Sequence, residues 1–358
     1  MSKIRASSKV EASRSMTISR RAALLGGAAS VLATTTGRQA VAQTALSPQL
    51  AELYERAKPE GEVSIWGPSA TTIGWIPDIF AERFRDIKVS FVGSEQAAAR
   101  FITESRANRH TADLWFYSLG ATLDIQSRGL LQKHDWASLG AKPEGIFFGG
   151  EVVAMNNHVS TPIFSRSLVK DDDVPRQYEA LLDPRWKDNM VASSFLLPRM
   201  AAYLAIEWGL QRTQKWMRAL IDDNRTMITT APVSDLLFSG ERRLAISESV
   251  GAARRMNNAG RNVGYRLMEI VPCTQFTLAV TKNTPHPNAA RFLAAWLMTS
   301  EAKTLFSERA GLSDVRTDPN SPLSREIQAA RLKPVFEDVN TMDQRADYYR
   351  QLSAIAKG

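Results

Sequence analysis

The sequence predicts an α/β fold of two lobes, each a mainly parallel sheet flanked by helices, with two crossover strands forming a hinge. Three observations support this prediction. Short β-like runs alternate with helical patterns over residues 63–131, which is typical of a parallel sheet covered on both faces. The 358 residues less a leader of 43 leave 315, more than one core usually supports. Apolar runs at 152–155 and 276–280 are placed to leave the first lobe and to return to it.

Residues 1–43 have the pattern of an export signal. A basic, polar stretch precedes the pair Arg20-Arg21, an apolar run over 22–33 and an A-x-A cleavage site at 40–42. The run is too short to cross a bilayer, which needs about 20 residues. The arginine pair resembles a twin-arginine signal, while Ala23, where Phe is usual, leaves the Sec route open. The sequence therefore predicts cleavage near Ala42 and localisation in the periplasm.

Charge and rare residues exclude several classes of function. Without the leader, 38 of the 45 Lys and Arg and 36 of the 37 Asp and Glu remain, so no nucleic-acid partner is expected. Cys273 is the only cysteine, which rules out an intramolecular disulfide. The four His show no metal-binding spacing, and no nucleotide-binding or hydrolase motif occurs. We therefore expect no resident metal, no cofactor and no catalytic residue.

The first lobe is assigned to residues 44–155 and 276–310. Its predicted strands are 63–66, 87–92 and 113–117, and its predicted helices are 75–84, 97–107 and 121–131. The return strand 276–280 leads to a helix for which Asn288 is the predicted N-cap, and a further helix runs from Ser300 to Gly311.

The second lobe is assigned to residues 156–275 and 311–358. Its predicted strands are 190–192 and 243–247, and its predicted helices are 204–210, 216–221 and 252–259.

Three segments carry a family resemblance. Residues 177–188 read Q-Y-E-A-L-L-D-P-R-W-K-D, and they resemble the x-[YW]-x-D-L-L-D-P-[KR]-W-K-G segment of periplasmic solute-binding proteins, with Ala180 and Asp188 as departures. Asp183-Pro184 would end a helical piece, and Trp186 would anchor the turn. Residues 240–246 resemble G-E-x-x-[LV]-[GA]-I, and residues 285–293 resemble the P-H-P-[NE]-A-A-x-x-F segment.

The chain thus resembles the ferric-iron-type solute-binding proteins of ABC importers. The resemblance implies the type II periplasmic binding fold, in which a small solute is clamped between two lobes by hinge closure. It also implies the membrane permease as a partner, a monomeric receptor and no enzymatic activity.

Candidate ligand-binding residues follow the predicted strands, where helix N-termini present free N–H groups. Most are small hydroxyls, which are also ordinary helix caps, and they are joined by one phenol and two charged residues. The set is Ser69, Thr71, Thr72, Ser94, Tyr117, Ser118, Ser193, Ser194, Thr229, Thr230, Ser247, Ser249, Arg199 and Glu248.

The nature of the solute is left with alternatives. Relatives that carry ferric iron usually supply adjacent tyrosines from the second lobe, whereas the Tyr348-Tyr349 pair of this chain lies in its C-terminal tail. A small anionic or zwitterionic solute, such as a carboxylate or phosphonate, is therefore favoured over ferric ion. An exported enzyme or a ligand-sensing subunit on the same fold remains the alternative from another class, although no His follows a strand assigned to the cleft.

Overall fold

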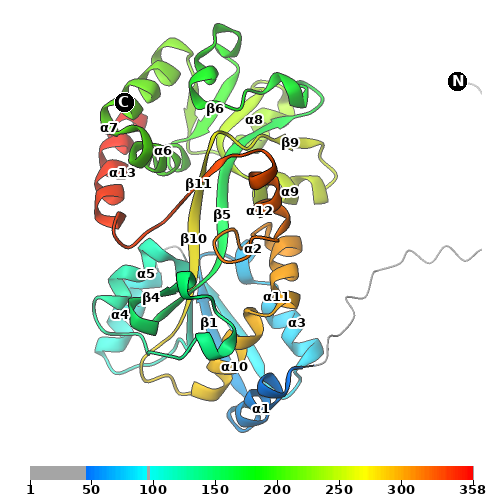
Figure 1. The fold of residues 1–358 in the computed structure, drawn as a ribbon, viewed down its shortest axis with the longest axis vertical. Coiled ribbons are helices and arrows are strands. Elements are labelled where there is room, and N and C mark those ends of the chain that lie inside the picture. The colour runs from blue at the N-terminus through cyan, green and yellow to red at the C-terminus, as the bar shows by residue number, and fades with distance from the viewer. Residues whose placement is uncertain (1–45, 95–96, 358) are drawn as a thin grey trace, which may run out of the picture. The chain divides into compact units, whose positions relative to one another are not determined.

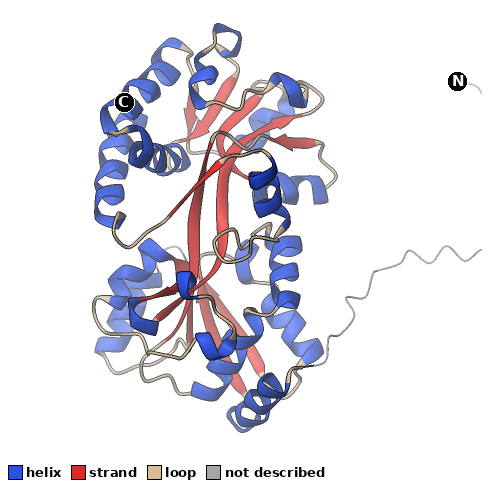
Figure 2. Cartoon of the chain, in the orientation of Figure 1, coloured by secondary structure: helices blue, strands red, loops and turns tan. Residues whose placement is uncertain are grey.

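The computed structural model describes residues 46–94 and 97–357 and confirms the two-lobed α/β architecture (Figure 1). The predicted export signal lies outside the described residues. Helices flank the strands in each lobe (Figure 2). Among the described residues, no helix combines the length and apolar character needed to cross a membrane.

The first lobe is built on parallel strands. Strand β1 pairs in parallel with β2 and β3, and β10 closes this sheet by pairing antiparallel with β3. Its strands are β1 (Glu62–Gly67), β2 (Lys88–Gly93), β3 (Leu114–Ser118) and β4 (Ile146–Phe147). Its main helices are α1 (Pro48–Ala57), α2 (Ala70–Ile73), α3 (Ile76–Arg83), α4 (Ala97–Arg106), α5 (Leu119–Gln126), α10 (Pro287–Leu297), α11 (Ser300–Leu305) and the π-helical turn η9 (Phe306–Ala310).

The second lobe repeats the plan, with β6 parallel to both β7 and β8. Its strands are β6 (Met190–Ser193), β7 (Met227–Thr229), β8 (Leu244–Ser249) and β9 (Val263–Tyr265). Its main helices are α6 (Leu196–Trp208), α7 (Leu210–Arg218), η8 (Ala219–Asp223), α8 (Val233–Ser239), α9 (Val250–Asn258), α12 (Pro322–Ala329) and α13 (Met342–Lys357). The helices predicted over 204–210 and 216–221 are parts of α6 and α7, which separate at Gly209, where φ is +83°.

Two long antiparallel strands run through both lobes and form the hinge. They are β5 (Val152–Ser165) and β10 (Ile270–Val280), and the strand order is β2-β1-β3-β10-β5-β8-β6-β7. A third strand, β11 (Lys333–Phe336), pairs in parallel with β10. The predicted strands 152–155 and 276–280 are therefore only the first-lobe ends of the two crossovers. The lone Cys273 lies in β10, fully buried, and burial raises the pKa of its thiol well above the usual range.

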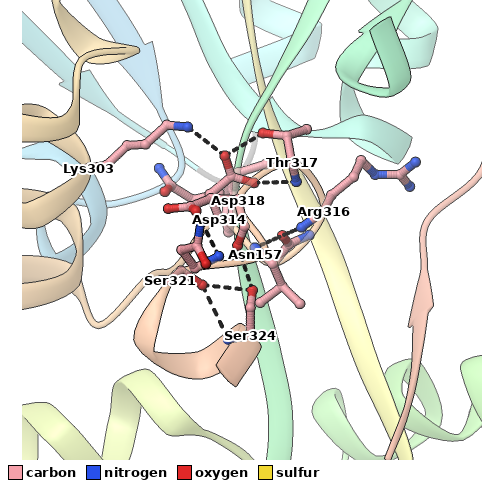
Figure 3. Close-up of polar contacts among 12 residues, drawn as sticks. Asn157, Lys303, Asp314, Arg316, Thr317, Asp318, Ser321 and Ser324 are labelled. Atoms are coloured by element: carbon pink, nitrogen blue, oxygen red, sulfur yellow. Dashed lines mark hydrogen bonds and ion pairs between the residues drawn. The ribbon is translucent and has the colours of Figure 1, made fainter. Parts of the chain in front are cut away.

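A polar loop that includes Asp314, Val315 and Arg316 covers one face of the hinge (Figure 3). Asn157 of β5 accepts hydrogen bonds from the backbone N–H groups of Val315 (2.8 Å) and Arg316 (3.2 Å). Asp314, which is 3% exposed, pairs with Lys303 of α11 at 2.7 Å. These contacts close this face with protein groups, so the opposite face of β5 and β10 is the one to consider for a ligand.

The first lobe has an aromatic core. Phe80 of α3 and Phe84 at its C-terminal end pack against Phe292 and Trp296 of α10, with ring centroids 4.9–5.9 Å apart. Both Phe292 and Trp296 are fully buried. Phe292 and Trp296 thus lie on the buried face of α10.

The start of α10 differs from the prediction. Asn288 is not its N-cap; the N-cap position is His286, which makes no side-chain cap bond. Instead the Glu60 carboxylate accepts from the Asn288 backbone N–H (3.0 Å), the Asn288 side chain (2.7 Å) and the Ala289 N–H (2.7 Å). A residue more than two hundred positions earlier thus supplies the negative charge that a helix N-terminus favours.

Removing this remote cap should cost measurable stability. We expect Glu60→Ala to lower the free energy of unfolding by about 1–2 kcal/mol, the usual range for a lost N-cap, in urea denaturation followed by circular dichroism. Glu55→Ala is the matched control, because its exposed carboxylate pairs only with Lys58 within its own turn. Equal stability of the two variants would contradict the capping role of Glu60.

The segment over 177–188 holds the second-lobe core together. Trp186 is 4% exposed, and the Asp183 side chain accepts from the Arg185 N–H at 2.9 Å, forming the predicted tight turn. Tyr178 is fully buried, and Trp216 donates to its carbonyl at 2.9 Å. This segment therefore stabilises the lobe and contributes no side chain to a ligand site.

The C-terminal segment contacts both lobes. Met342, at the start of α13, packs in the first-lobe core with Leu119, whereas Leu352 and Ala356 pack in the second-lobe core. Just before α13, the buried Glu337 carboxylate accepts from Arg345 and from the Gln275 N–H. The Glu337 carboxylate therefore links α13 to the hinge strand β10.

Candidate functional site

The candidate site lies on the α6 side of the hinge strands. In the β5–β10 ladder His158 pairs with Thr274 and Asn156 pairs with Phe276. The Tyr203 hydroxyl of α6 lies 3.1 Å from Thr274 Oγ1, which identifies the face of the hinge that α6 covers. Because side chains alternate along a strand, Asn156 and His158 share a face, opposite to the Asn157 side chain that binds the polar loop.

Two arginines act electrostatically on His158. Arg199 lies one turn into α6, and Arg255 extends from α9 and donates to the Ala310 carbonyl at 3.1 Å. Both positive charges, together with burial, lower the pKa of His158 to about 4. Neither arginine forms an ion pair with any carboxylate of residues 46–94 or 97–357. The site therefore holds two guanidinium groups that form no close ion pair, next to a neutral imidazole.

Glu248 is the acidic member of the site. It is the penultimate residue of β8 and is partly buried; burial raises its pKa, and Arg255 opposes the shift. Burial correspondingly lowers the pKa of Arg255, while Glu248 raises it. We call Arg199, Arg255, His158, Glu248 and Asn156 the cationic site.

The cationic site also offers unused hydrogen-bonding groups. Asn156 is 0% exposed, and neither its amide nitrogen nor its amide oxygen has a partner among the described residues. A buried polar group without a partner costs about 1–3 kcal/mol. A bound solute with donors and acceptors would recover that free energy.

On the first lobe, the predicted hydroxyls bond mainly to one another and to the backbone. Ser69 Oγ lies 2.9 Å from Thr71 Oγ1 and 3.0 Å from Thr72 Oγ1. Ser118 caps α5 by accepting from the Ala121 N–H at 3.4 Å. The Tyr117 hydroxyl lies 2.8 Å from two carbonyl oxygens, those of Gly67 and Ser94, and so joins the ends of β1 and β2.

On the second lobe, the predicted residues fall into separate groups. Ser193 accepts from the Phe195 and Leu196 N–H groups at 3.3 Å, and Ser249 caps α9 by accepting from the Ala252 N–H at 3.0 Å. Ser247 is 1% exposed and lies beneath the surface. Of the predicted set, Arg199 and Glu248 are the two that the structure places in the cationic site.

Three other predicted residues line a cavity in the second lobe, apart from the cationic site. Ser194, Thr229 and Thr230 line a space of about 1230 Å³ between the ends of β6 and β7 and helices α7 and α13. None of the cationic-site residues lines this space. The hydroxyls that follow neighbouring strands therefore do not converge on one pocket, contrary to the expectation that they form a single ligand site.

Three of the described tyrosine hydroxyls are engaged by other side chains. Tyr203 bonds to Thr274, Tyr265 to Glu326 and Tyr54 to Asp86. Burial raises the pKa of Tyr265 and of Tyr54 to about 12, which keeps these phenols neutral. Within the described parts of the chain, no group of three or more His, Cys, Asp or Glu is placed to hold a metal ion.

Sequence reasoning missed Asn156, His158 and Arg255. The side chain of Arg255 is exposed, yet its guanidinium donates to the Ala310 carbonyl and acts on Glu248. The polar run Asn156-Asn157-His158 interrupts an apolar strand. That interruption is the signal that could have indicated a functional segment in the hinge.

The lowered pKa of His158 predicts a pH dependence of stability. Its native pKa of about 4 lies below the ordinary 6.5, so between these values the unfolded chain binds a proton that the native state does not. Stability should fall as pH is lowered from about 6.5 to 5, with His158 contributing about 1–2 kcal/mol. Chemical denaturation of His158→Gln should show a smaller loss than the native protein.

The matched control for this measurement is His110→Gln, because His110 lies outside the site, is half-buried and hydrogen-bonds to Asn108. It should leave the pH profile unchanged. An identical profile for His158→Gln and the native protein would contradict the assignment.

Solved structures share this fold at low sequence identity. Iron-bound HitA from Pseudomonas aeruginosa is 17% identical, with a TM-score of 0.64 over 81% of this chain and 99% of that one. Apo ferric ion-binding protein A from Pasteurella haemolytica is 14% identical, with a TM-score of 0.65 over 83% and 97%. The substrate-binding protein of an ABC transporter from Agrobacterium tumefaciens is 14% identical, with a TM-score of 0.65 over 84% and 97%.

These similarities confirm, at the level of the fold, the predicted resemblance to ferric-iron-type solute-binding proteins. No protein-family model matches the chain, and no curated protein matches it by sequence.

Proposed function

We propose that the protein is the periplasmic solute-binding component of an ABC importer. In this proposal the first 43 residues direct export, and the mature protein binds a small anionic or zwitterionic solute in the cationic site. It then delivers the solute to membrane permease subunits as a monomer, and it carries out no chemical reaction. The shared fold with solved substrate-binding proteins supports the role in transport.

The observation that carries the choice of ligand is the pair of guanidinium groups without carboxylate partners. The charges of Arg199 on α6 and of Arg255 on α9 both act on the His158 imidazole. Guanidinium groups bind carboxylate and phosphate-type oxygens in a bidentate geometry. A carboxylate or phosphonate would neutralise this charge, and the amide of Asn156 would add a donor and an acceptor.

The proposed mechanism is a ligand-dependent shift between two arrangements of the lobes. The site is built on the hinge strands themselves, so a solute there contacts groups whose positions depend on the bend of β5 and β10. A solute that binds one arrangement of the lobes more tightly increases the population of that arrangement. The size of the shift is set by the difference between its affinities for the two arrangements. The permease would then recognise the liganded arrangement.

The proposal is tested by calorimetry with small carboxylates and phosphonates. Arg199→Ala and Arg255→Ala should each weaken binding roughly 10- to 100-fold, since a hydrogen bond to a charged group contributes about 1.5–3 kcal/mol. Arg225→Ala is the control, because its exposed side chain contacts only Asp188 at 3.9 Å. Unchanged affinity in both site variants would contradict the proposal.

Ferric ion is the second candidate solute. HitA is described as iron-bound, and the Pasteurella protein as a ferric ion-binding protein. The hydroxyls of Tyr203, Tyr265 and Tyr54 are engaged by Thr274, Glu326 and Asp86, which argues against phenolate ligation by these three. Titration with ferric citrate decides between the candidates: a visible phenolate-to-iron absorption band, lost when Tyr117 is changed to Phe, would favour iron.

Export is tested separately. The amino terminus of the exported protein should lie at Gln43 or Thr44, as determined by N-terminal sequencing of a periplasmic extract. Replacing Arg20 and Arg21 by Lys should block export by the twin-arginine route and leave Sec export largely unchanged.

A further inference from the structure

Phe195 is an exposed aromatic residue at the edge of the cationic site. It follows Ser194 at the end of β6 and is 47% exposed; among the described residues, Leu168 and Val339 are the other large hydrophobic side chains with comparable exposure. Scattered exposed apolar residues are normal and need no explanation by themselves. The contacts of Phe195 distinguish it.

Two side chains hold the Phe195 ring in place. The Arg199 guanidinium lies over the ring, 4.2 Å from its centroid, and Tyr349 of α13 meets it edge-on at 6.4 Å and 83°. Cation–π and edge-to-face contacts are favoured geometries. These two contacts restrain the Phe195 ring, while nearly half of the residue's surface stays exposed.

Arg199 links this ring to the cationic site. The Arg199 guanidinium forms no hydrogen bond or ion pair with the described residues. Its positive charge acts electrostatically on both His158 and Glu337. One side chain therefore covers part of an aromatic ring and also supplies a free anion-binding group. A ligand bound to Arg199 would lie next to the open part of the ring.

We propose that Phe195 determines specificity, and that the solute is a planar aromatic anion. This inference rests on the proposed function. The anionic group would bind Arg199 and Arg255, and the aromatic ring would pack against the open surface of Phe195. A ring already fixed by Arg199 and Tyr349 loses little freedom when it packs against a ligand.

The inference is tested by calorimetry with phenylphosphonate and methylphosphonate, which share an anionic group and differ in the ring. Phenylphosphonate should bind about tenfold more tightly, the combined effect of an aromatic contact and apolar burial. Phe195→Ala should reduce this ratio to near one, and Phe195→Leu to an intermediate value. Leu168→Ala, an equally exposed apolar residue, should leave it unchanged.

Several outcomes would overturn the inference while the proposed function stands. They are equal affinities of the native protein for the two probes, equal weakening of both by Phe195→Ala, and no effect of that variant on either. Equal weakening would mean that Phe195 only positions Arg199. Failure of the native protein to bind either phosphonate, or binding that Arg199→Ala and Arg255→Ala leave intact, would overturn the proposed function and this inference together.

Discussion

Arg345→Met is expected to lower the free energy of unfolding by about 3–5 kcal/mol at pH 7, the range for removing one partner of a buried ion pair. Glu337 is 2% exposed, and its carboxylate accepts from Arg345 and from the Gln275 N–H. Without the guanidinium, the carboxylate charge stays buried beside β10. Urea denaturation of the two proteins measures the difference.

The pH dependence of that loss has a definite sign. Burial raises the pKa of Glu337, and Arg345 opposes the shift, so the variant should have a carboxyl that protonates more readily. A raised native pKa contributes stability at low pH that is lost as pH rises through it. The deficit of Arg345→Met should therefore shrink as pH is lowered from 7 toward the ordinary range of a Glu carboxyl.

Two further variants isolate the buried pair. Arg350→Met, on the same helix, removes an arginine whose side chain is 76% exposed and which pairs with Asp347, so a change under about 1 kcal/mol is expected. The double variant Glu337→Gln, Arg345→Met should recover part of the loss, because no buried charge then lacks a partner. A deficit as large in Arg350→Met as in Arg345→Met would contradict the explanation.

Gly311→Ala is expected to destabilise the protein by about 2–4 kcal/mol, combining backbone strain with overpacking. Gly311 has φ +66°, a conformation that favours glycine, and an added Cβ would lie 2.4 Å from the Gly251 Cα of α9. That contact joins the turn after η9 to the first turn of α9, next to the arginine of the cationic site. Thermal and urea unfolding measure the effect.

A matched glycine separates strain from contact. Gly129 has φ +67°, and an added Cβ there would meet nothing within 4 Å. Gly129→Ala should therefore show only the backbone cost, about 1 kcal/mol. Equal losses at the two positions would show that the close approach of Gly311 to Gly251 does not contribute.

The fold was predictable because it depends on local patterns repeated along the chain. The strands at 63–66 and 113–117 and the apolar face containing Phe292 and Trp296 are visible as periodicities of two or of three to four residues. The crossovers were recognised only in part. The apolar signal of β5 stops at Asn156, although the strand continues to Ser165.

The candidate site was less predictable because its contacts join residues far apart in sequence. Nothing local to Tyr117 indicates that its hydroxyl binds carbonyls 50 and 23 residues earlier. Likewise Glu60 caps a helix 228 residues later. Hydroxyls at strand ends were correctly placed near helix starts, yet that pattern describes caps as well as ligand sites, and only the folded arrangement distinguishes them.

The single buried Cys273 makes the native chain suitable for site-specific labelling. Its thiol is enclosed in the hinge strand, and burial raises its pKa, so thiolate-selective dyes should not modify it in the folded protein. Exposed positions in the two lobes, such as Lys142 and Lys215, can then be changed to Cys without first removing a native thiol. Fluorescence energy transfer between such a pair would follow lobe movement in single molecules as solute is added.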